Sequence, residues 1–373
     1  MKEKFIVALS QKDGENAIRE VALKIKYSFL KPVKLFFLLF TPQYNPQILL
    51  KTISLTLNPD FILGIQSPFL IFEEQIIEKG IIGCCFTKKQ ITLKKLFINK
   101  ETKATIENIE SSVRLVTKNF KDKQFFFSLL SPDFNIFNCI QGFTLALGSA
   151  FTILGAGFFR KYGNKNYVIS NDTIDEGLLG IIGNGLKIET FRIEGFVPVG
   201  KPFLITKVAE EQGIIRQINS RPPIEIYKHY FDEKIDIFVK NKLFTLYPLI
   251  TEEGYLINVI DCLEDGSFLC IGDVKEKKYA HLSIFHPEAM FYSIKDKLNL
   301  VQSGEDGLLF MINSTMRKKI IKEYAYKEIE TIRQLLNKNL KIIGMYSDFF
   351  IFPNYVDRKI QSETATNLLM FLQ

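Results

Sequence analysis

The stretch FTILGAGFF at residues 151–159 is followed, after a polar segment, by EGLLGIIGNGLKIETFRIEG at residues 176–195 and FVPVGKPFLIT at residues 196–206. Glycines interrupt each apolar run, and glycine lets the backbone approach a neighbour or a ligand closely. We therefore expect buried strands here that form the floor of a pocket. Gly155, Ala156 and Gly157 are its candidate ligand-binding residues.

A turn signal lies in the middle of this stretch, where Asn184-Gly185 separates two apolar runs. A type I′ turn needs positive φ at both central residues, and Asn-Gly adopts that conformation at little cost. The pattern predicts a β-hairpin of residues 177–183 and 186–194. A further strand is expected to end at Thr206.

The N-terminal part alternates between helical and strand patterns. The apolar run KLFFLLF at residues 34–40 predicts a buried strand, and a helix and a second strand at residues 61–65 follow it. This order favours parallel pairing of the two strands. Ligands of such sheets lie at the carboxyl ends of the strands, so Gly64, Gln66 and Ser67 are also candidate ligand-binding residues.

The same reasoning gives the other elements and an α/β fold with mixed β-sheets flanked by helices. No solenoid-scale repeat is evident. Further helices are predicted at residues 15–29, 106–118, 137–147, 287–298 and 320–336, and another helix is predicted to begin after a cap at Ser220. Strands are predicted at residues 124–130, 308–312, 342–346 and 364–371. Two hairpins are predicted, one of residues 80–86 with 90–98 and one of residues 255–262 with 267–272.

The composition is that of an ordinary globular protein. The 373 residues suggest two domains, which we place at residues 1–231 and 232–373. A net charge of +7 on a chain of this length gives no nucleic-acid footprint. Residues 139–159 are diluted by polar residues and glycines, so we expect no membrane insertion. Five cysteines without a signal peptide pattern predict buried, reduced thiols and a cytoplasmic protein.

No catalytic or cofactor motif is legible. Gly155-x-Gly157 lacks the third glycine of a dinucleotide loop, and neither a P-loop nor GxSxG occurs. Three histidines and five cysteines without metal-ligand spacing predict no metal site. We therefore expect no cofactor and no catalytic residues. Arg317, in the segment 314–317 after a predicted strand, has the fork geometry to hold an anion.

The order of these elements resembles the FIST family, with its N-terminal and C-terminal parts, over roughly residues 14–372. The closest resemblance is Gly177–Gly185 followed by Gly195-Phe-Val-Pro-Val-Gly-Lys-Pro202. In the second part, Asp348 and Phe349 replace a Gly-Glu pair of the family pattern, so a ligand site there is altered or the chain is a divergent member. The resemblance implies an intracellular sensory or signal-transduction module that binds small ligands such as amino acids.

Together these observations predict a non-enzymatic sensor with a small polar metabolite held between its two parts. Beyond the glycine floor, the candidate contacts are Asn313, Ser314, Arg317, Tyr346 and Thr364. The expected partners are this ligand and a separate signalling protein. The alternatives are a hydrolase that uses Ser67 or a cysteine, and a scaffold that binds only protein.

Overall fold

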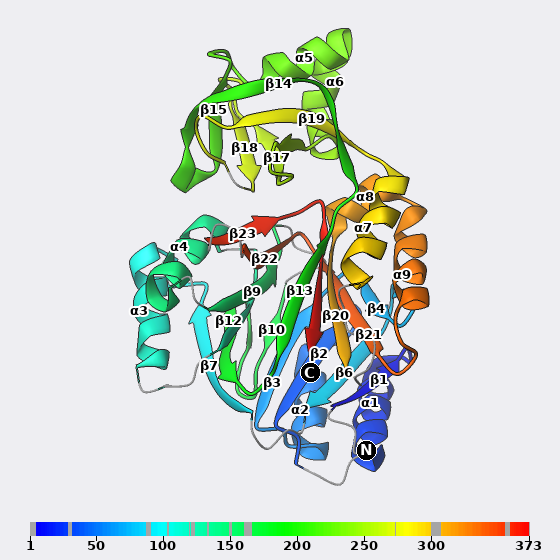
Figure 1. The fold of residues 1–373 in the computed structure, drawn as a ribbon. Coiled ribbons are helices and arrows are strands. Elements are labelled where there is room, and N and C mark those ends of the chain that lie inside the picture. Colours follow the sequence, from blue (N-terminus) through cyan, green and yellow to red (C-terminus); the bar gives the residue numbers. More distant parts are fainter. Residues whose placement is uncertain are drawn as a thin grey trace.

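The computed structural model describes residues 5–28, 32–86, 91–102, 104–118, 120, 124–132, 134–148, 151–159, 166–272, 274–299, 307–354 and 359–372. Figure 1 shows a body of three six-stranded sheets with a smaller closed β-barrel above it. The α/β fold with mixed sheets and flanking helices is thereby confirmed. The predicted division at residue 231 lies inside the barrel part and stays a prediction.

The body is built from three units with the same order of elements. The first contains β1 (Phe5–Ser10), α1 (Gly14–Ser28), β2 (Leu35–Phe40), α2 (Pro46–Thr56), β3 (Phe61–Gln66), β4 (Leu70–Phe72), β5 (Gln75–Ile77) and β6 (Ile81–Phe86). The second contains β7 (Thr92–Asn99), α3 (Ile106–Thr117), β8 (Phe125–Leu130), α4 (Ile136–Leu147), β9 (Thr152–Gly157), β10 (Val168–Ile169), β11 (Ile174–Asp175) and β12 (Gly177–Asn184).

The third unit is interrupted by the barrel. It contains β13 (Ile188–Ile193), α7 (Pro287–Asn299), β20 (Leu308–Ser314), α8 (Thr315–Ile321), α9 (Tyr324–Leu335), β21 (Lys341–Ser347), β22 (Phe349–Asn354), β23 (Lys359–Glu363) and β24 (Asn367–Leu372). The barrel part contains β14 (Phe196–Ala209), η1 (Glu210–Gln212), β15 (Ile214–Ile218), α5 (Ile224–Phe231), η2 (Asp232–Lys234), α6 (Ile235–Lys240), η3 (Leu243–Leu246), β16 (Leu249–Thr251), β17 (Leu256–Cys262), β18 (Phe268–Ile271) and β19 (Tyr279–Phe285).

Strand pairing repeats from unit to unit. The parallel pairs are β2–β3, β8–β9 and β20–β21. The last strand of each unit is β6, β12 or β24. It lies antiparallel between two strands of its own unit: β6 between β1 and β2, β12 between β7 and β8, and β24 between β13 and β20. The body is therefore a threefold structural repeat, which the sequence reading did not detect.

The short hairpins are exchanged between units in a closed cycle. The β4–β5 hairpin of the first unit extends the sheet of the third, through the pairing of β4 with β21. The β10–β11 hairpin extends the first sheet, and β22–β23 extends the second. Each sheet is thus completed by a neighbouring unit, which ties the three units together.

The three sheets face one another around a shared apolar core. Phe37, Phe127 and Phe310 occupy the same register in their units, opposite Leu63, Leu154 and Ile343. Their ring centroids lie 5.6 to 6.0 Å apart in all three pairings. These distances are typical of attractive aromatic contacts, so the three rings anchor the units at the axis of the body.

Glycine recurs at one register position for a steric reason. Gly64, Gly155 and Gly344 face Ile169, Ile351 and Ile71 of the exchanged hairpins. A Cβ atom built on Gly344 would lie 2.3 Å from the carbonyl oxygen of Met311. The position therefore accepts glycine because the neighbouring strands leave no space for a side chain.

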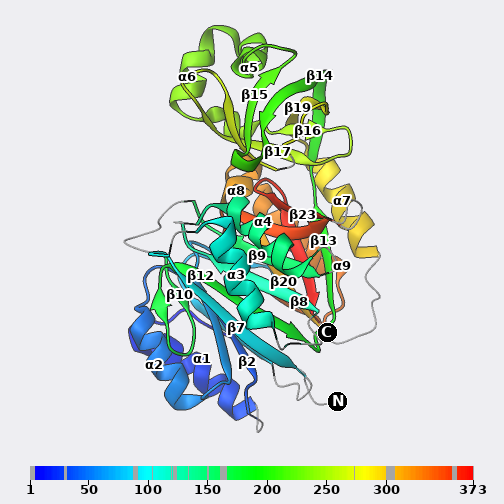
Figure 2. The ribbon, with the colours of Figure 1, turned by 90° about the vertical axis from the view of Figure 1, so that its left-hand side faces the viewer.

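Helices cover the outer faces of the sheets (Figures 1 and 2). The pair α1 and α2 packs on the first sheet, α3 and α4 on the second, and α7 and α9 on the third. Asn45, Thr105 and Asn135 cap α2, α3 and α4 by accepting hydrogen bonds from backbone amides of the first turn. No helix of the described residues is long and apolar enough to cross a membrane.

Two predicted hairpins are wrong. β12 and β13 do not pair with each other, because β7 and β8 occupy both edges of β12 and β13 pairs with β24. Likewise β6 lies between β1 and β2, while β7 pairs with β12. The expected turn of this second hairpin, at residues 87–89, lies outside the described residues. The hairpin of β17 and β18 is confirmed.

Two helix predictions also need correction. The predicted helix at residues 320–336 is divided into α8 and α9, with Lys322 at a positive φ of 49° between them. Ser220 does not cap a helix, since it has φ of 62° and α5 begins after Pro223.

The barrel joins the body through one narrow neck. The chain enters it between β13 and β14 and leaves it between β19 and α7. The two crossings lie side by side, because the backbone amide of His286 donates to the carbonyl oxygen of Gly195 at 2.7 Å. Gly195 has a φ of 147°, a conformation that favours glycine.

Candidate functional site

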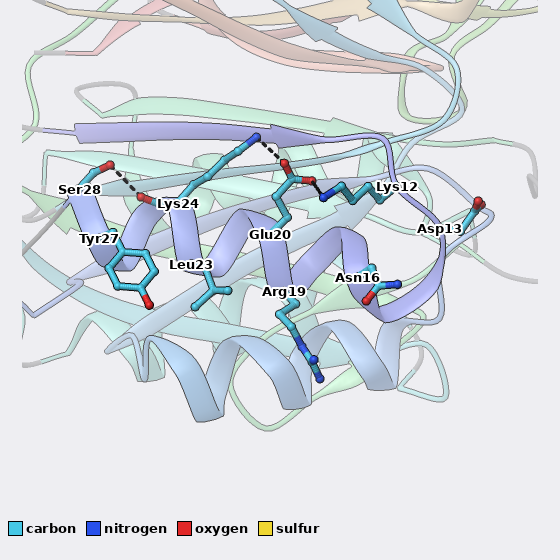
Figure 3. A pocket seen from close by; sticks show the side chains of 9 residues that line it. All are labelled: Lys12, Asp13, Asn16, Arg19, Glu20, Leu23, Lys24, Tyr27 and Ser28. Carbon is cyan, nitrogen blue, oxygen red and sulfur yellow. Dashed lines mark hydrogen bonds and ion pairs between the residues drawn. The ribbon is translucent and has the colours of Figure 1, made fainter.

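One hollow is a surface groove along α1, with a volume of about 860 Å³. Figure 3 shows Glu20 between Lys12 and Lys24, with ion pairs to both at 3.5 and 2.8 Å. Arg19 on the same helix pairs with Glu15 at 2.8 Å. These charges are satisfied within the helix surface and none of the predicted site residues lies here, so the groove offers little to recognise a polar ligand.

A second hollow lies at the junction of barrel and body. It has a volume of about 670 Å³, within the usual range of small-ligand sites. We call it the junction cavity. The barrel part supplies Lys240, Asn241, Lys242, Thr245, Ile260, Asp261 and Leu269, and the body supplies Phe159, Thr315, Met316, Lys319, Asp348 and Thr364.

Asp348 fixes the body wall of the junction cavity. One carboxylate oxygen accepts a hydrogen bond from the Thr315 hydroxyl, and the other accepts from the Phe159 backbone amide at 3.0 Å. Its own backbone amide donates to the carbonyl oxygen of Gly157 at 2.9 Å. The residue that departs from the family pattern therefore connects the ends of β9 and β21 at the cavity.

Thr364 carries an unused polar group in this wall. Its side chain is 1% exposed, and its hydroxyl has no hydrogen-bond partner among the described residues. A buried polar group without a partner costs free energy, of the order of 1–3 kcal/mol. A ligand or a water molecule that bonds to this hydroxyl would remove that cost.

The charged side chains of the junction cavity are only partly paired. Lys242 forms an ion pair with Asp261 at 2.7 Å. Lys240 and Lys319 are exposed at the cavity and form no ion pair with any residue in the described ranges. Two cationic groups from opposite walls are therefore free to bind an anionic group.

Arg317 does hold a carboxylate, but it is that of Glu328. The guanidinium is fully buried, and its Nε and Nη2 donate to Oε1 of Glu328 at 3.0 and 2.6 Å. Nη1 donates to the carbonyl oxygen of Ala365 and Nη2 to that of Glu194, at 2.9 and 3.0 Å. Arg317 thus connects the neck, the segment before β24 and helix α9.

Asn313 and Ser314 belong to the same buried network. The Asn313 amide donates to Glu328 at 3.0 Å, and the Ser314 hydroxyl caps α8 by accepting from the amides of Met316 and Arg317. These contacts satisfy the groups that we expected to bind ligand. They build the frame behind the junction cavity.

The residues at the end of β3 are also engaged by protein. The Ser67 hydroxyl lies 2.6 Å from the carbonyl oxygen of Phe69 and 2.8 Å from that of Tyr346, and the residue is fully buried. Ser67 therefore joins the first and third sheets and is not placed to attack a substrate. Tyr346 is buried beside the Phe69 ring, with its hydroxyl unpartnered among the described residues.

The predicted glycine floor meets protein side chains. A Cβ atom on Gly155 would lie 2.5 Å from the Ser128 hydroxyl, and one on Gly157 would lie 2.3 Å from the Phe349 ring. Gly64 is similarly covered by Ile169. Of all the predicted ligand contacts, Thr364 alone lines one of the hollows described above, and ligand contact by the others, Gly64, Gln66, Ser67, Gly155, Ala156, Gly157, Asn313, Ser314, Arg317 and Tyr346, stays a prediction.

A second ion-pair network supports the junction next to the cavity. Arg192 of β13 pairs with Glu194 and Glu363, and its guanidinium stacks 4.9 Å from the Tyr255 ring centre. Burial raises the pKa of Glu363, and the charge of Arg192 opposes that shift. The backbone amide of Leu256, in the barrel, donates to the same carboxylate at 3.4 Å.

The thiols do not form a reactive site. Cys84, Cys85, Cys139 and Cys270 are buried, as predicted, whereas Cys262 is only half-buried, and burial raises the pKa of Cys85 to about 12. A thiol with a raised pKa is a poor nucleophile because the thiolate is the reactive form. Within the described ranges, no cluster of His, Cys, Asp or Glu could hold a metal ion.

The fold and the cavity define a two-part α/β protein with a polar site at the junction of its parts. The chain belongs to the FIST family: the FIST N domain matches residues 34–221 and the FIST C domain matches residues 223–349. FIST domains are signal-transduction sensor domains. The resemblance found in the sequence is thereby confirmed over most of the chain.

The comparison with curated proteins finds no significant match. Among solved structures, a cyanuric acid hydrolase from A. caulinodans is similar over 99% of this chain and 98% of its own, with 6% identity and a TM-score of 0.41. A chorismatase is similar over 98% of each chain, with 7% identity and a TM-score of 0.34.

Proposed function

We propose that this protein is a sensor that binds a small polar metabolite carrying a carboxylate, such as an amino acid or an organic acid, in the junction cavity. The main support for this proposal is that one wall of the cavity comes from the barrel and the other from the body. Lysines without an ion pair to any described residue stand on both walls, Lys240 on the barrel side and Lys319 on the body side, and Thr364, whose hydroxyl has no partner among the described residues, belongs to the body wall. A carboxylate between Lys240 and Lys319 would be attracted from both sides.

Ligand binding in this geometry favours one placement of the barrel on the body. The chain passes between body and barrel at the neck formed by Gly195 and His286, and other contacts across the junction, such as the hydrogen bond from Leu256 to Glu363, are noncovalent, so the junction is the surface that such a ligand would bridge. A ligand that binds one arrangement more tightly shifts the population toward it. The signal would then pass to a separate protein in the cytoplasm.

Thermal unfolding in the presence of a library of amino acids and organic acids tests this proposal. Thr364→Val keeps the volume of the side chain and removes the hydroxyl, and Lys319→Gln removes one free charge. We expect both variants to weaken the binding of a hit compound by about five- to tenfold. The matched controls are Thr331→Val, at a half-buried position on α9, and Lys26→Gln, at an exposed position on α1, both away from the junction cavity.

A library without any stabilising compound would count against the small-ligand function. Equal loss of binding in the site variants and in the controls would place the ligand elsewhere. The hydrolase alternative gains no support from Ser67, whose hydroxyl bonds to backbone carbonyl groups.

A further inference from the structure

A groove on the barrel gathers cationic side chains from separate segments. Its volume is about 800 Å³, and it shares no lining residue with the junction cavity. We call it the barrel groove; β14, β15 and α5 contribute to it, and Figure 1 shows α5 at the top of the barrel and β14 rising toward it from the body. It is lined by Gly200, Lys201, Pro202, Phe203, Ile218, Asn219, Arg221, Pro222, Glu225, Ile226, His229 and Tyr230.

A β-bulge presents the first cation. The register of β14 against β19 shifts between Val199 and Phe203, and Gly200 has a φ of 74°. Bulges bend a strand and redirect a side chain. Lys201 lies in this bulge. A hydrogen bond between His281 Nδ1 and the carbonyl oxygen of Gly200, at 3.2 Å, holds the bulge in place.

A strained turn presents the second cation. Asn219 and Ser220 both have positive φ, at 48° and 62°, which is uncommon for residues other than glycine. The turn is fixed by hydrogen bonds, since Leu204 donates to the Asn219 side chain at 2.9 Å and Ser220 to the Thr206 hydroxyl at 3.0 Å. Arg221 follows directly and lines the groove.

Helix α5 completes the site. His229 and Tyr230 face the groove from its last turn, and the Tyr230 hydroxyl packs against the Gly200 backbone. Glu225 is the acidic residue in the lining, and Lys228 neutralises it at 2.7 Å. Neither Lys201 nor Arg221 has an ion-pair partner in the part of the chain that the structure describes.

We propose that the barrel groove binds a phosphate-bearing small molecule with an apolar ring. The fork of Arg221 matches the oxygens of a phosphate group, and Lys201 and His229 supply further donors. A dianion is favoured over a carboxylate because Lys201 and Arg221 attract it from two separate segments. Pro202, Pro222 and Tyr230 provide flat apolar walls for the ring.

Nuclear magnetic resonance of the histidine rings in the full-length protein tests this proposal. The chain has three histidines, so the ring signals are few and His229→Gln assigns the one in the groove. Phenyl phosphate is the probe, with inorganic phosphate, benzoate and sodium chloride of equal ionic strength as comparisons. We expect a saturable shift of the His229 signal with phenyl phosphate and no shift of His286 at the neck.

Arg221→Gln should weaken this titration by about tenfold, and Arg216→Gln on β15, outside the lining, should change it less than about twofold. An unchanged His286 signal shows that each variant is folded. Equal effects of benzoate and phenyl phosphate would overturn the choice of phosphate. Parallel shifts of all three histidines, or equal shifts with sodium chloride, would overturn the site. Neither result bears on the junction cavity, which is probed separately.

Discussion

Replacement of Arg317 by methionine is the sharpest test of how the body and the neck are held together. Methionine fills a similar space but removes the guanidinium and its bonds to Glu328, Ala365 and Glu194. Glu328 would remain fully buried, with the Asn313 side-chain amide donating to it at 3.0 Å. The variant therefore leaves a carboxylate in the protein interior without its counter-charge.

The expected loss is large because both partners are fully buried. Removing one member of a buried ion pair costs about 3–5 kcal/mol of the free energy of unfolding. The double variant Arg317→Met/Glu328→Leu removes both charges, so we expect it to recover at least about half of that loss. As a control, Arg19→Met breaks an exposed pair with Glu15 and should cost less than about 1 kcal/mol.

Urea denaturation followed by circular dichroism measures these differences. The reasoning is refuted if Arg317→Met lies within about 1 kcal/mol of the wild type, which would mean that the pair is not desolvated. It is equally refuted if the double variant is as unstable as the single one. In that case the loss would come from packing and not from the isolated charge.

Three further predictions concern thiols, pH and steric fit. A thiol reagent should modify Cys262 alone in the native protein, because the other thiols are buried, and equally fast labelling of a second thiol would contradict this. Burial raises the pKa of Glu363 above its ordinary 4.5, so above pH 4.5 the folded state keeps a proton that the unfolded state has lost. The stabilisation from this group is therefore fully present below about pH 4.5 and declines as the pH rises through the raised pKa. Melting temperatures of the wild type and Glu363→Gln should therefore diverge with pH, and a constant difference would show that the carboxyl group does not titrate abnormally. Gly344→Ala should cost about 1–3 kcal/mol in urea denaturation and Gly64→Ala less, since the added Cβ would meet a backbone oxygen at 2.3 Å in the first case and a side-chain Cβ at 3.0 Å in the second; the reverse order would contradict the close approach.

Local elements of the fold could be predicted because their signals lie within short segments. The strand–helix–strand order at residues 34–66 led to the parallel pair β2–β3, as expected. The Asn184-Gly185 signal failed because a turn preference does not specify which strands pair. Here β12 is buried between β7 and β8, and β13 continues to another sheet.

The threefold repeat was hidden for a different reason. Its equivalent positions share few residues, among them the phenylalanines Phe37, Phe127 and Phe310 and the glycines Gly64, Gly155 and Gly344, and the barrel interrupts the third unit. Exchange of the hairpins further separates each sheet from its own sequence segment. A repeat of this kind is recognised from strand register and not from sequence spacing.

The site was predicted only in part. Thr364 lines the junction cavity, and its contact with a ligand stays a prediction; Lys240 and Lys319 were not singled out, because they come from elements that meet only in the folded chain. Arg317 was singled out in the sequence as a residue that could hold an anion, and the structure pairs it with Glu328. Their pairing could not be inferred, since an arginine suited to a ligand carboxylate is equally suited to one from the protein.

The neck makes the barrel a detachable cassette. Because Gly195 and His286 are hydrogen-bonded neighbours, a short linker could join them in place of residues 196–285 without separating the strands and helices of the body. Such a deletion would keep the strand pairing of the three units and their exchanged hairpins, and it would uncover body residues that pack against the barrel, such as Ala365. Replacement of residues 196–285 by another domain during evolution would give the same body a different barrel part and a different ligand specificity.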